Sequence, residues 1–177
     1  MSVYVLRANA EFMSETEAAI ISAFEWAVIA KEGGHHEYYD HIRQVYRLMQ
    51  PEIDAGRYRP NAVDWPRIMS PIEREAWIDI QQRRYRMFPQ YPVLGYFLDF
   101  ADPWEKVAIE CDGKQWHTDK ERDAKRDRLL GMHGWHVHRV SGKRIWRERP
   151  NDDDLQVLRG HEPFRHWLDD FWWRHDE

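Results

Sequence analysis

The chain has 177 residues, of which 42% are hydrophobic and 32% are charged, and this balance favours a folded globular protein over a disordered one. No run of about 18 apolar residues is present, which excludes a transmembrane helix, and the first ten residues lack the apolar run of a secretory signal. A single cysteine excludes an internal disulfide and a cysteine-based zinc site, so we expect a cytoplasmic protein.

The formal net charge of −5 is unevenly distributed along the chain. Residues 114–149 contain eleven lysines and arginines against five acidic residues, whereas residues 150–177 contain three against eight. A basic segment between acidic flanks favours a local phosphate-binding face. A solvated helix of mixed charge would explain the same composition.

Two helices are expected near the N-terminus. Ser14 and Glu17 have the spacing of a capping box, and the nearly apolar run over 18–30 predicts a buried helix. A second helix is expected over 37–49 and should end at Pro51, since proline cannot donate the next helical hydrogen bond. We therefore interpret residues 1–69 as a helical extension packed on the core.

The next segment predicts an α/β core. Ser70 and Glu73 form a second capping box at the start of a helix that should reach about Arg83. Strands are expected over 85–90, 96–100, 107–112 and 135–140, with a charged helix over 119–132 before the last strand. The order predicts a mixed central sheet flanked by helices in a core over 70–149. Residues 150–177 are expected to form an acidic, tryptophan-rich C-terminal helix, centred on 162–174.

Three carboxylates follow the predicted strands of this core. Asp99 lies in one strand, while Glu110 and Asp112 share one face of the next, because strand side chains alternate. Crowded carboxylates repel one another unless a cation lies among them, and oxygen ligands suit Mg²⁺ or Mn²⁺. His117 follows a tight turn and is a candidate general base. Together with nearby lysines and arginines, these groups suit metal-assisted phosphodiester cleavage.

Each of these residues also has a structural explanation. Asp99 would cap a turn, Glu110 would pair with Arg126, His117 would lie on the surface, and Asp112 would begin a hairpin turn. Their common spacing favours the active-site interpretation. A histidine-rich metal protein, with His35, His36 and His41 as ligands, is a weaker alternative.

The residues resemble a known nuclease family. The order of Asp99, Glu110-Cys111-Asp112-Gly113, His117, Asp123, Arg126 and a Gly-Trp-x-Val-x-Arg segment ending at Arg139 is similar to the very-short-patch-repair-like branch of the PD-(D/E)XK nucleases. The resemblance covers about residues 70–146 and implies a restriction-endonuclease-like fold. The mismatch endonucleases of that branch hold a structural zinc through cysteines that this chain lacks, which argues against mismatch recognition.

The resemblance also implies roles for individual residues. Asp99 and Glu110 match the metal-binding acids, Asp112 stands where many relatives have lysine, and His117 matches a histidine that assists water activation. Glu73 matches an acid near the metal, although its capping box explains it equally well. Supporting roles are implied or expected for Gln90, Gln115, Asp123 and Arg139.

We therefore expect a Mg²⁺-dependent (or Mn²⁺-dependent) endonuclease acting on DNA, with RNA not excluded and no membrane association. Phosphates would be held by the basic residues Lys114, Arg122, Lys125, Arg126, Lys143 and Arg144. The alternative is a catalytically inactive nuclease-fold module that binds nucleic acid or protein. The aromatic-rich N- and C-terminal extensions suggest contacts with a protein partner or a second copy of the chain, and a bacterial, phage or mobile-element origin is expected.

Overall fold

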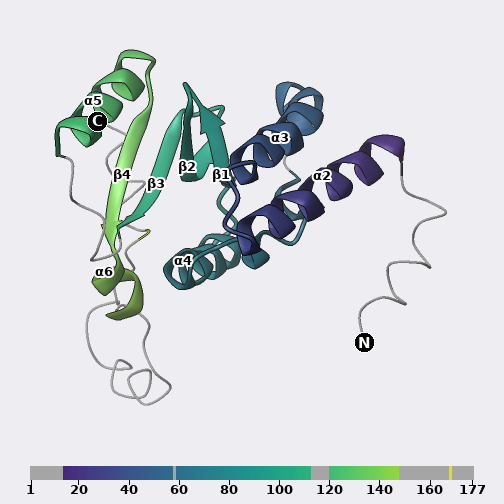
Figure 1. The fold of residues 1–177 in the computed structure, drawn as a ribbon. Coiled ribbons are helices and arrows are strands. Elements are labelled where there is room, and N and C mark those ends of the chain that lie inside the picture. The colour runs from purple at the N-terminus through teal and green to yellow at the C-terminus, as the bar shows by residue number, and fades with distance from the viewer. Residues whose placement is uncertain (1–13, 58, 113–119, 148–167, 169–177) are drawn as a thin grey trace. The chain divides into compact units, whose positions relative to one another are not determined.

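The computed structural model describes residues 14–57, 59–112 and 120–147 together with Leu168, and the side chains of Lys120, Arg122 and Arg147 are left out of that description. The chain divides into two compact units, Met1–Ile68 and Met69–Glu177. Figure 1 shows the elements of both units. Apart from Leu168, the expected C-terminal helix over 162–174 lies outside the described residues, and the packing of residues 1–69 on the core stays a prediction.

The first unit is a helical pair followed by two short 3-10 turns. Helix α2 spans Glu15–Glu32 and α3 spans Tyr38–Asp54, and the turns η1 and η2 span Pro60–Ala62 and Trp65–Arg67. The capping box predicted at Ser14 is confirmed, since the Ser14 hydroxyl accepts a hydrogen bond from the Glu17 amide and the Glu17 carboxylate accepts one from the Ser14 amide.

Trp65 lies at the centre of this unit. Its indole is fully buried, contacts the ring of Phe24 edge-on at 5.3 Å and stacks on the ring of Tyr46 at 5.7 Å. The indole Nε1–H donates to the carbonyl of Pro60 over 2.6 Å, so the polar end of the side chain is satisfied where it is buried. One aromatic residue at the start of η2 therefore joins both helices and the turns into one core.

The expectation that Pro51 ends the second helix is wrong. Helix α3 continues through Pro51 to Asp54. The last turn buries Ile53 almost completely, and the Gln50 side chain donates to the Asp54 carboxylate over 2.7 Å. Burial of one large apolar side chain is worth about 1.5–3 kcal/mol, which is comparable with the cost of a proline this close to the helix end.

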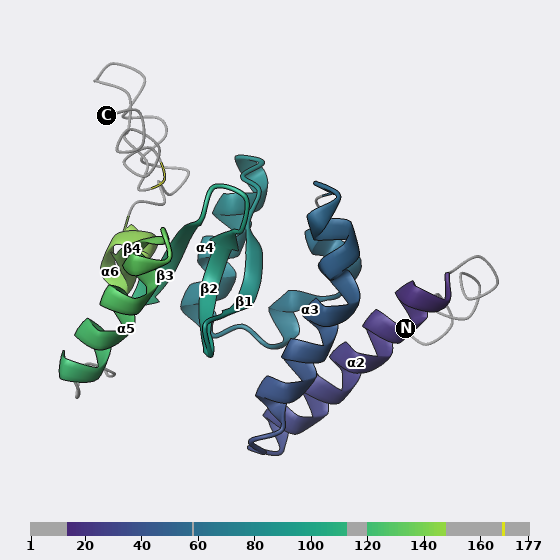
Figure 2. The same ribbon diagram turned by 90° about the horizontal axis from the view of Figure 1, so that it is seen from above.

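The second unit contains a four-stranded mixed sheet with flanking helices, which confirms the predicted α/β class. Helix α4 (Pro71–Gln82) precedes strands β1 (Phe88–Val93), β2 (Tyr96–Asp102) and β3 (Val107–Asp112), and helix α5 (Lys120–Met132) precedes β4 (His136–Ser141) and α6 (Gly142–Arg147). The strands lie in the order β1-β2-β3-β4; the first two pairings are antiparallel and the third is parallel. Figures 1 and 2 both show α5 beside β4, at that edge of the sheet.

Strand β1 begins three residues later than expected and contains two prolines. Pro89 and Pro92 donate no hydrogen bond, and β1 tolerates them because it is an edge strand. The strand joins β2 through Leu94 and Gly95, whose φ angles are 51° and 84°. Positive φ at both central residues is what a type I′ hairpin turn requires.

The two faces of the sheet differ in character. Leu98 and Phe100 of β2 are fully buried, and the Trp77 indole of α4 stacks on the Phe100 ring at 5.8 Å with the planes nearly parallel. Asp99 lies between them in the strand, so its side chain belongs to the opposite face. Among the helices that the structure describes, we find none with the length and apolar character needed to cross a bilayer.

Candidate functional site

Strand register brings four polar residues into one row across the sheet. Phe100 pairs with Ile109, so Asp99 lies opposite Glu110, one step beyond the last paired residues. Extending the β1–β2 register sets Gln90, whose φ is 52°, opposite Asp99, although these two residues are not among the paired ones; Glu110 pairs directly with Arg139. Opposite residues on antiparallel neighbours have Cβ atoms about 4.5–5.5 Å apart, so the two predicted metal-binding acids are neighbours.

Asp99 takes part in the sheet through its side chain. Its Oδ2 accepts a hydrogen bond from the backbone amide of Cys111 over 2.8 Å, at the point where the β2–β3 pairing ends. Burial raises the pKa of Asp99 well above its usual range, and the negative charges of Glu110 and Glu73 raise it further. The single amide hydrogen bond opposes these effects but does not cancel them.

Asp102, at the other end of the same strand, shows how a structural carboxylate is satisfied. Its side chain is 2% exposed, and its Oδ1 accepts hydrogen bonds from the amides of Trp104 and Glu105 over 3.0 and 3.2 Å. The Arg86 guanidinium lies 3.3 Å from its Oδ2. Asp102 therefore has two amides and a cation in direct contact, whereas Asp99 accepts one amide hydrogen bond and is subject to the charges of Glu110 and Glu73, which the charge of Arg126 opposes.

Glu110 is bound by the guanidinium of Arg126 from α5. The Arg126 Nη2 and Glu110 Oε1 atoms lie 2.5 Å apart, and the two side chains are only 16% and 9% exposed. Burial raises the pKa of Glu110, although the charge and hydrogen bond of Arg126 act in the opposite direction. The structural alternative that we kept for Glu110, a pair with Arg126, is thus present in the structure.

Arg139 connects the row to Asp112 and to helix α5. Its Nη1 lies 3.4 Å from the Asp112 carboxylate, and its Nη2 donates to Asp127 over 3.0 Å. These two contacts of Arg139 connect the end of β3 with β4 and α5. Asp127 was missed at the sequence level, because only the folded arrangement of α5 beside β4 brings it to Arg139.

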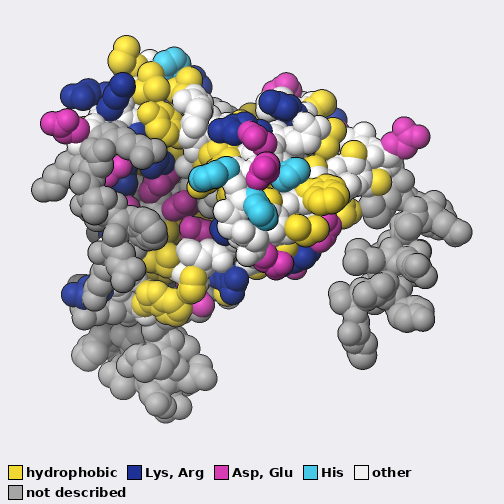
Figure 3. Space-filling view, in the orientation of Figure 1, with side chains coloured by type: hydrophobic (Ala, Val, Ile, Leu, Met, Phe, Trp, Pro, Cys, Tyr) yellow, Lys and Arg dark blue, Asp and Glu magenta, His cyan; other side chains and the backbone are white. Residues whose placement is uncertain are grey.

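Glu73 makes the predicted capping box, and its role near a metal stays a prediction. Its carboxylate accepts the Ser70 amide over 3.0 Å and its own amide donates to the Ser70 hydroxyl over 3.4 Å, which completes the predicted capping box. Its charge is also close enough to raise the pKa of Asp99. The capping geometry therefore holds a third carboxylate near the row, and Figure 3 shows acidic side chains gathered over this part of the sheet.

The remaining predicted residues are only partly covered. Lys125 and Lys143 are exposed on α5 and α6, while Asp123 and Arg144 are half-buried. Lys114, Gln115 and His117 lie outside the described residues, as does the side chain of Arg122. Their assignments stay predictions.

The donor chemistry of the row fits a hard divalent cation. Within the described ranges, no group of three or more His, Cys, Asp or Glu side chains is arranged to hold a metal ion. Magnesium, however, is usually bound through one or two carboxylates, with water and substrate phosphates completing its shell. Asp99 and Glu110 supply two such carboxylates, and burial is the main cause that raises the pKa of each, although the charges of Arg126 and Arg139 oppose it at Glu110.

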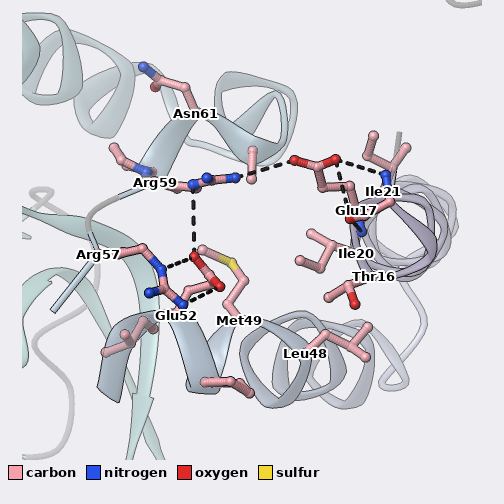
Figure 4. A pocket seen from close by; sticks show the side chains of 15 residues that line it. Thr16, Glu17, Ile20, Ile21, Leu48, Met49, Glu52, Arg57, Arg59 and Asn61 are labelled. Atoms are coloured by element: carbon pink, nitrogen blue, oxygen red, sulfur yellow. Dashed lines mark hydrogen bonds and ion pairs between the residues drawn. The ribbon is translucent and has the colours of Figure 1, made fainter. Parts of the chain in front are cut away.

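A separate hollow of about 730 Å³ lies in the first unit, between the start of α2, the end of α3 and the following loop. Its apolar walls include Ile20, Leu48 and Met49 (Figure 4). The charged groups at its rim neutralise each other, since Arg59 lies 3.3 Å from Glu17 and 3.9 Å from Glu52, which also binds Arg57. It has the size of a small-molecule site but lacks the unbalanced charge of the row.

Comparison with known families identifies a match over residues 73–160, which fit the family model REase_MTES_1575. The uncharacterized protein YcjD of Escherichia coli strain K12 is 35% identical over 92 residues, which cover 50% of this chain and 79% of that protein. An uncharacterized protein of Haemophilus influenzae strain Rd is 36% identical over 81 residues, or 43% of this chain and 67% of the relative.

Among solved structures, the catalytic domain of the homing endonuclease I-Bth0305I aligns with a TM-score of 0.42 and 18% identity. The alignment covers 62% of this chain and all of that domain.

Proposed function

We propose a nuclease function for this chain, which belongs through residues 73–160 to the restriction-endonuclease-like family REase_MTES_1575. The proposed reaction is the divalent-metal-dependent hydrolysis of phosphodiester bonds in DNA. The observation that carries the proposal is the row formed by Gln90, Asp99, Glu110 and Arg139, in which two acids are neighbours and the pKa of Asp99 is raised by burial and by the charges of Glu110 and Glu73.

The proposal assigns a separate role to each group of residues in the candidate site. Asp99 and Glu110 would hold Mg²⁺ or Mn²⁺, which when bound polarises the scissile phosphate and stabilises the leaving oxygen. The Cys111 amide keeps the Asp99 carboxylate in place, and Arg139 binds Asp112 at the end of β3. His117 is proposed to activate the attacking water, and Lys114, Lys125, Lys143 and Arg144 to hold neighbouring phosphates.

The finer assignment to the very-short-patch-repair-like branch rests on the sequence order from Asp99 to His117. The single cysteine of the chain argues against the zinc site of the mismatch endonucleases. We therefore propose a DNA substrate without mismatch recognition, and contacts with a protein partner or a second copy of the chain through residues outside the core.

The test is a cleavage assay on supercoiled plasmid and on single-stranded DNA with Mg²⁺, Mn²⁺ or a chelator. Asp99→Asn and Glu110→Gln should abolish cleavage while circular dichroism shows an unchanged fold, because each amide keeps the shape but loses the anionic charge. His117→Ala should be about 10²–10⁴-fold slower, the usual cost of losing a general base. Robust cleavage by Glu110→Gln would place the activity elsewhere in the chain.

The Arg126–Glu110 pair is also what an inactive nuclease-fold module would show, because it neutralises a carboxylate without a metal. The two functions differ in one measurable property. A nuclease must bind Mn²⁺ through Asp99 and Glu110, whereas an inactive module binds nucleic acid or protein with the same affinity in the presence of a chelator.

A further inference from the structure

Arg126 stands where a cation is needed in the candidate site. Its guanidinium binds Glu110 at 2.5 Å and lies 5.7 Å from the centre of the Tyr96 ring. Arg126 lies on helix α5, and Tyr96 lies at the start of β2 in the β1–β2 hairpin. Two elements that are separate in the chain therefore contact the guanidinium. The positive charge is placed on one of the two carboxylates that we propose as metal ligands.

The position is a poor one for an arginine. Its Nε is buried, and the described parts of the chain offer this atom no hydrogen-bond partner. A guanidinium has five N–H donors, and a buried donor without an acceptor costs free energy. A purely structural ion pair in a protein core normally satisfies these donors, so this arrangement is incomplete.

The charge balance around the arginine is also incomplete. Arg126 contacts Glu110 and the charge of Arg139 also acts on that carboxylate, but the group contains three carboxylates, and the charges of Glu110 and Glu73 raise the pKa of Asp99. A divalent cation held by Asp99 and Glu110 would neutralise these carboxylates better than the guanidinium does. Arg126 would then lose Glu110 as its partner. A phosphate diester offers several acceptor oxygens and is the natural alternative partner of an arginine.

We propose that Arg126 is a positioning residue that occupies Glu110 before the metal binds and is transferred to a nucleic-acid phosphate when a divalent cation takes its place. The inference rests on the proposed nuclease function. It links the two binding steps, because the metal frees the arginine that the phosphate requires. The Tyr96 ring keeps the guanidinium close to the row through a cation–π contact in the starting state.

The metal arm of the test compares Mn²⁺ affinity by calorimetric titration of the full chain at about pH 8, where unpaired carboxyls are ionised. Arg126→Met should bind Mn²⁺ about tenfold more tightly than the wild type, because no buried ion pair has to be broken first. Arg126→Lys, which keeps a charge, should restore part of the wild-type affinity. Arg128→Met is the matched control, since Arg128 is exposed on the same helix.

The nucleic-acid arm measures DNA binding by fluorescence anisotropy, with either saturating Ca²⁺, a hard cation with the same oxygen preference, or a chelator. Arg126→Met should weaken DNA binding with Ca²⁺ and leave it unchanged with the chelator, because the arginine reaches phosphate only after the metal displaces it. Arg128→Met should show the same ratio to wild type in both conditions. Thermal melting of each variant confirms that it is folded.

The outcomes separate this inference from the proposed function. If the wild type binds Mn²⁺ but Arg126→Met binds it more weakly or equally, Arg126 supports Glu110 and the displacement model is wrong, while the nuclease proposal stands. An equal loss of DNA affinity with and without Ca²⁺ would overturn the transfer to phosphate. A wild type that binds no divalent metal would overturn both proposals.

Discussion

At the scale of single residues, two carboxylates of one strand, the buried Asp102 and the half-buried Asp99, have opposite surroundings. Asp102 has two amides and an arginine, whereas Asp99 has one amide and two acidic neighbours. Ionisation of Asp99 in the folded protein is therefore unfavourable, because burial and the negative charges of Glu110 and Glu73 oppose it. This difference has a measurable effect on folding.

The raised pKa of Asp99 predicts how its replacement changes stability with pH. The folded protein keeps the Asp99 proton to higher pH than the unfolded chain does, so this group's contribution to stability is lost as the pH rises through its folded pKa. Asp99→Asn should therefore increase the free energy of unfolding in a metal-free buffer, with little gain near pH 4 and a larger gain near pH 8. Urea denaturation followed by tryptophan fluorescence measures the difference at each pH.

Glu73→Gln is the matched variant for the same measurement. Glutamine can complete the capping box, so the helix start is kept while one negative charge near Asp99 is removed. Its gain should have the same pH trend and be smaller than that of Asp99→Asn. A gain for Asp99→Asn that does not depend on pH would show that burial and charge at Asp99 are not its origin.

At the scale of elements, the β1–β2 hairpin has an unusual residue in its turn. Leu94 adopts φ 51° and is 40% exposed, so a branched apolar side chain occupies a left-handed position without being buried. Leu94→Asn should stabilise the protein by about 0.5–1 kcal/mol, because asparagine tolerates this conformation and is preferred in type I′ turns. Gly95→Ala, at φ 84°, should have the opposite effect in the same chemical denaturation experiment.

Features of these elements that depend on local sequence patterns could be predicted, whereas features that depend on tertiary packing could not. The capping boxes at Ser14 and Ser70 are local patterns, and both are confirmed. The limits of β1 and the passage of α3 through Pro51 depend on sheet position and on burial of Ile53, which the sequence does not state. Propensity therefore identified the elements, and tertiary packing determined several of their ends.

The candidate site follows the same division. Side-chain alternation placed the acids on predicted strands, but register decides that Asp99 faces Glu110 and that Arg139 is the partner of Glu110 in β4. The Arg126–Glu110 pair was one of two alternatives at the sequence level. The roles of Tyr96 and Asp127 required contacts between segments far apart in the chain.

At the scale of the whole molecule, the proposed DNA binding requires a local basic surface, because the formal net charge of the chain is −5. Lys125 on α5 and Lys143 on α6 are both exposed. The double variant Lys125→Gln/Lys143→Gln should weaken DNA binding and reduce the slope of log affinity against log salt by about 1.8, or about 0.9 for each lost phosphate contact. Fluorescence anisotropy over a salt series measures the slope.

Lys106→Gln is the control for that experiment. Lys106 lies in the β2–β3 turn and donates to the carbonyl of His133. It precedes β3, whereas Asp112 ends the same strand and α6 follows the parallel strand β4, so Lys106 lies at the other end of the sheet. If Lys106→Gln changed the slope as much as the double variant, the DNA surface would not follow α5 and α6.

The division into two compact units bears on how the protein melts. The first unit is built around Trp65, while every described residue of the row belongs to the second unit. A ligand stabilises only the cooperative unit that binds it, by about 1.4 kcal/mol at ten times its dissociation constant. Scanning calorimetry with increasing Mn²⁺ would therefore show whether the two units unfold together. If the heat-absorption peak splits as the metal is added, the units melt separately. If the peak moves to higher temperature without splitting, the chain unfolds as a whole.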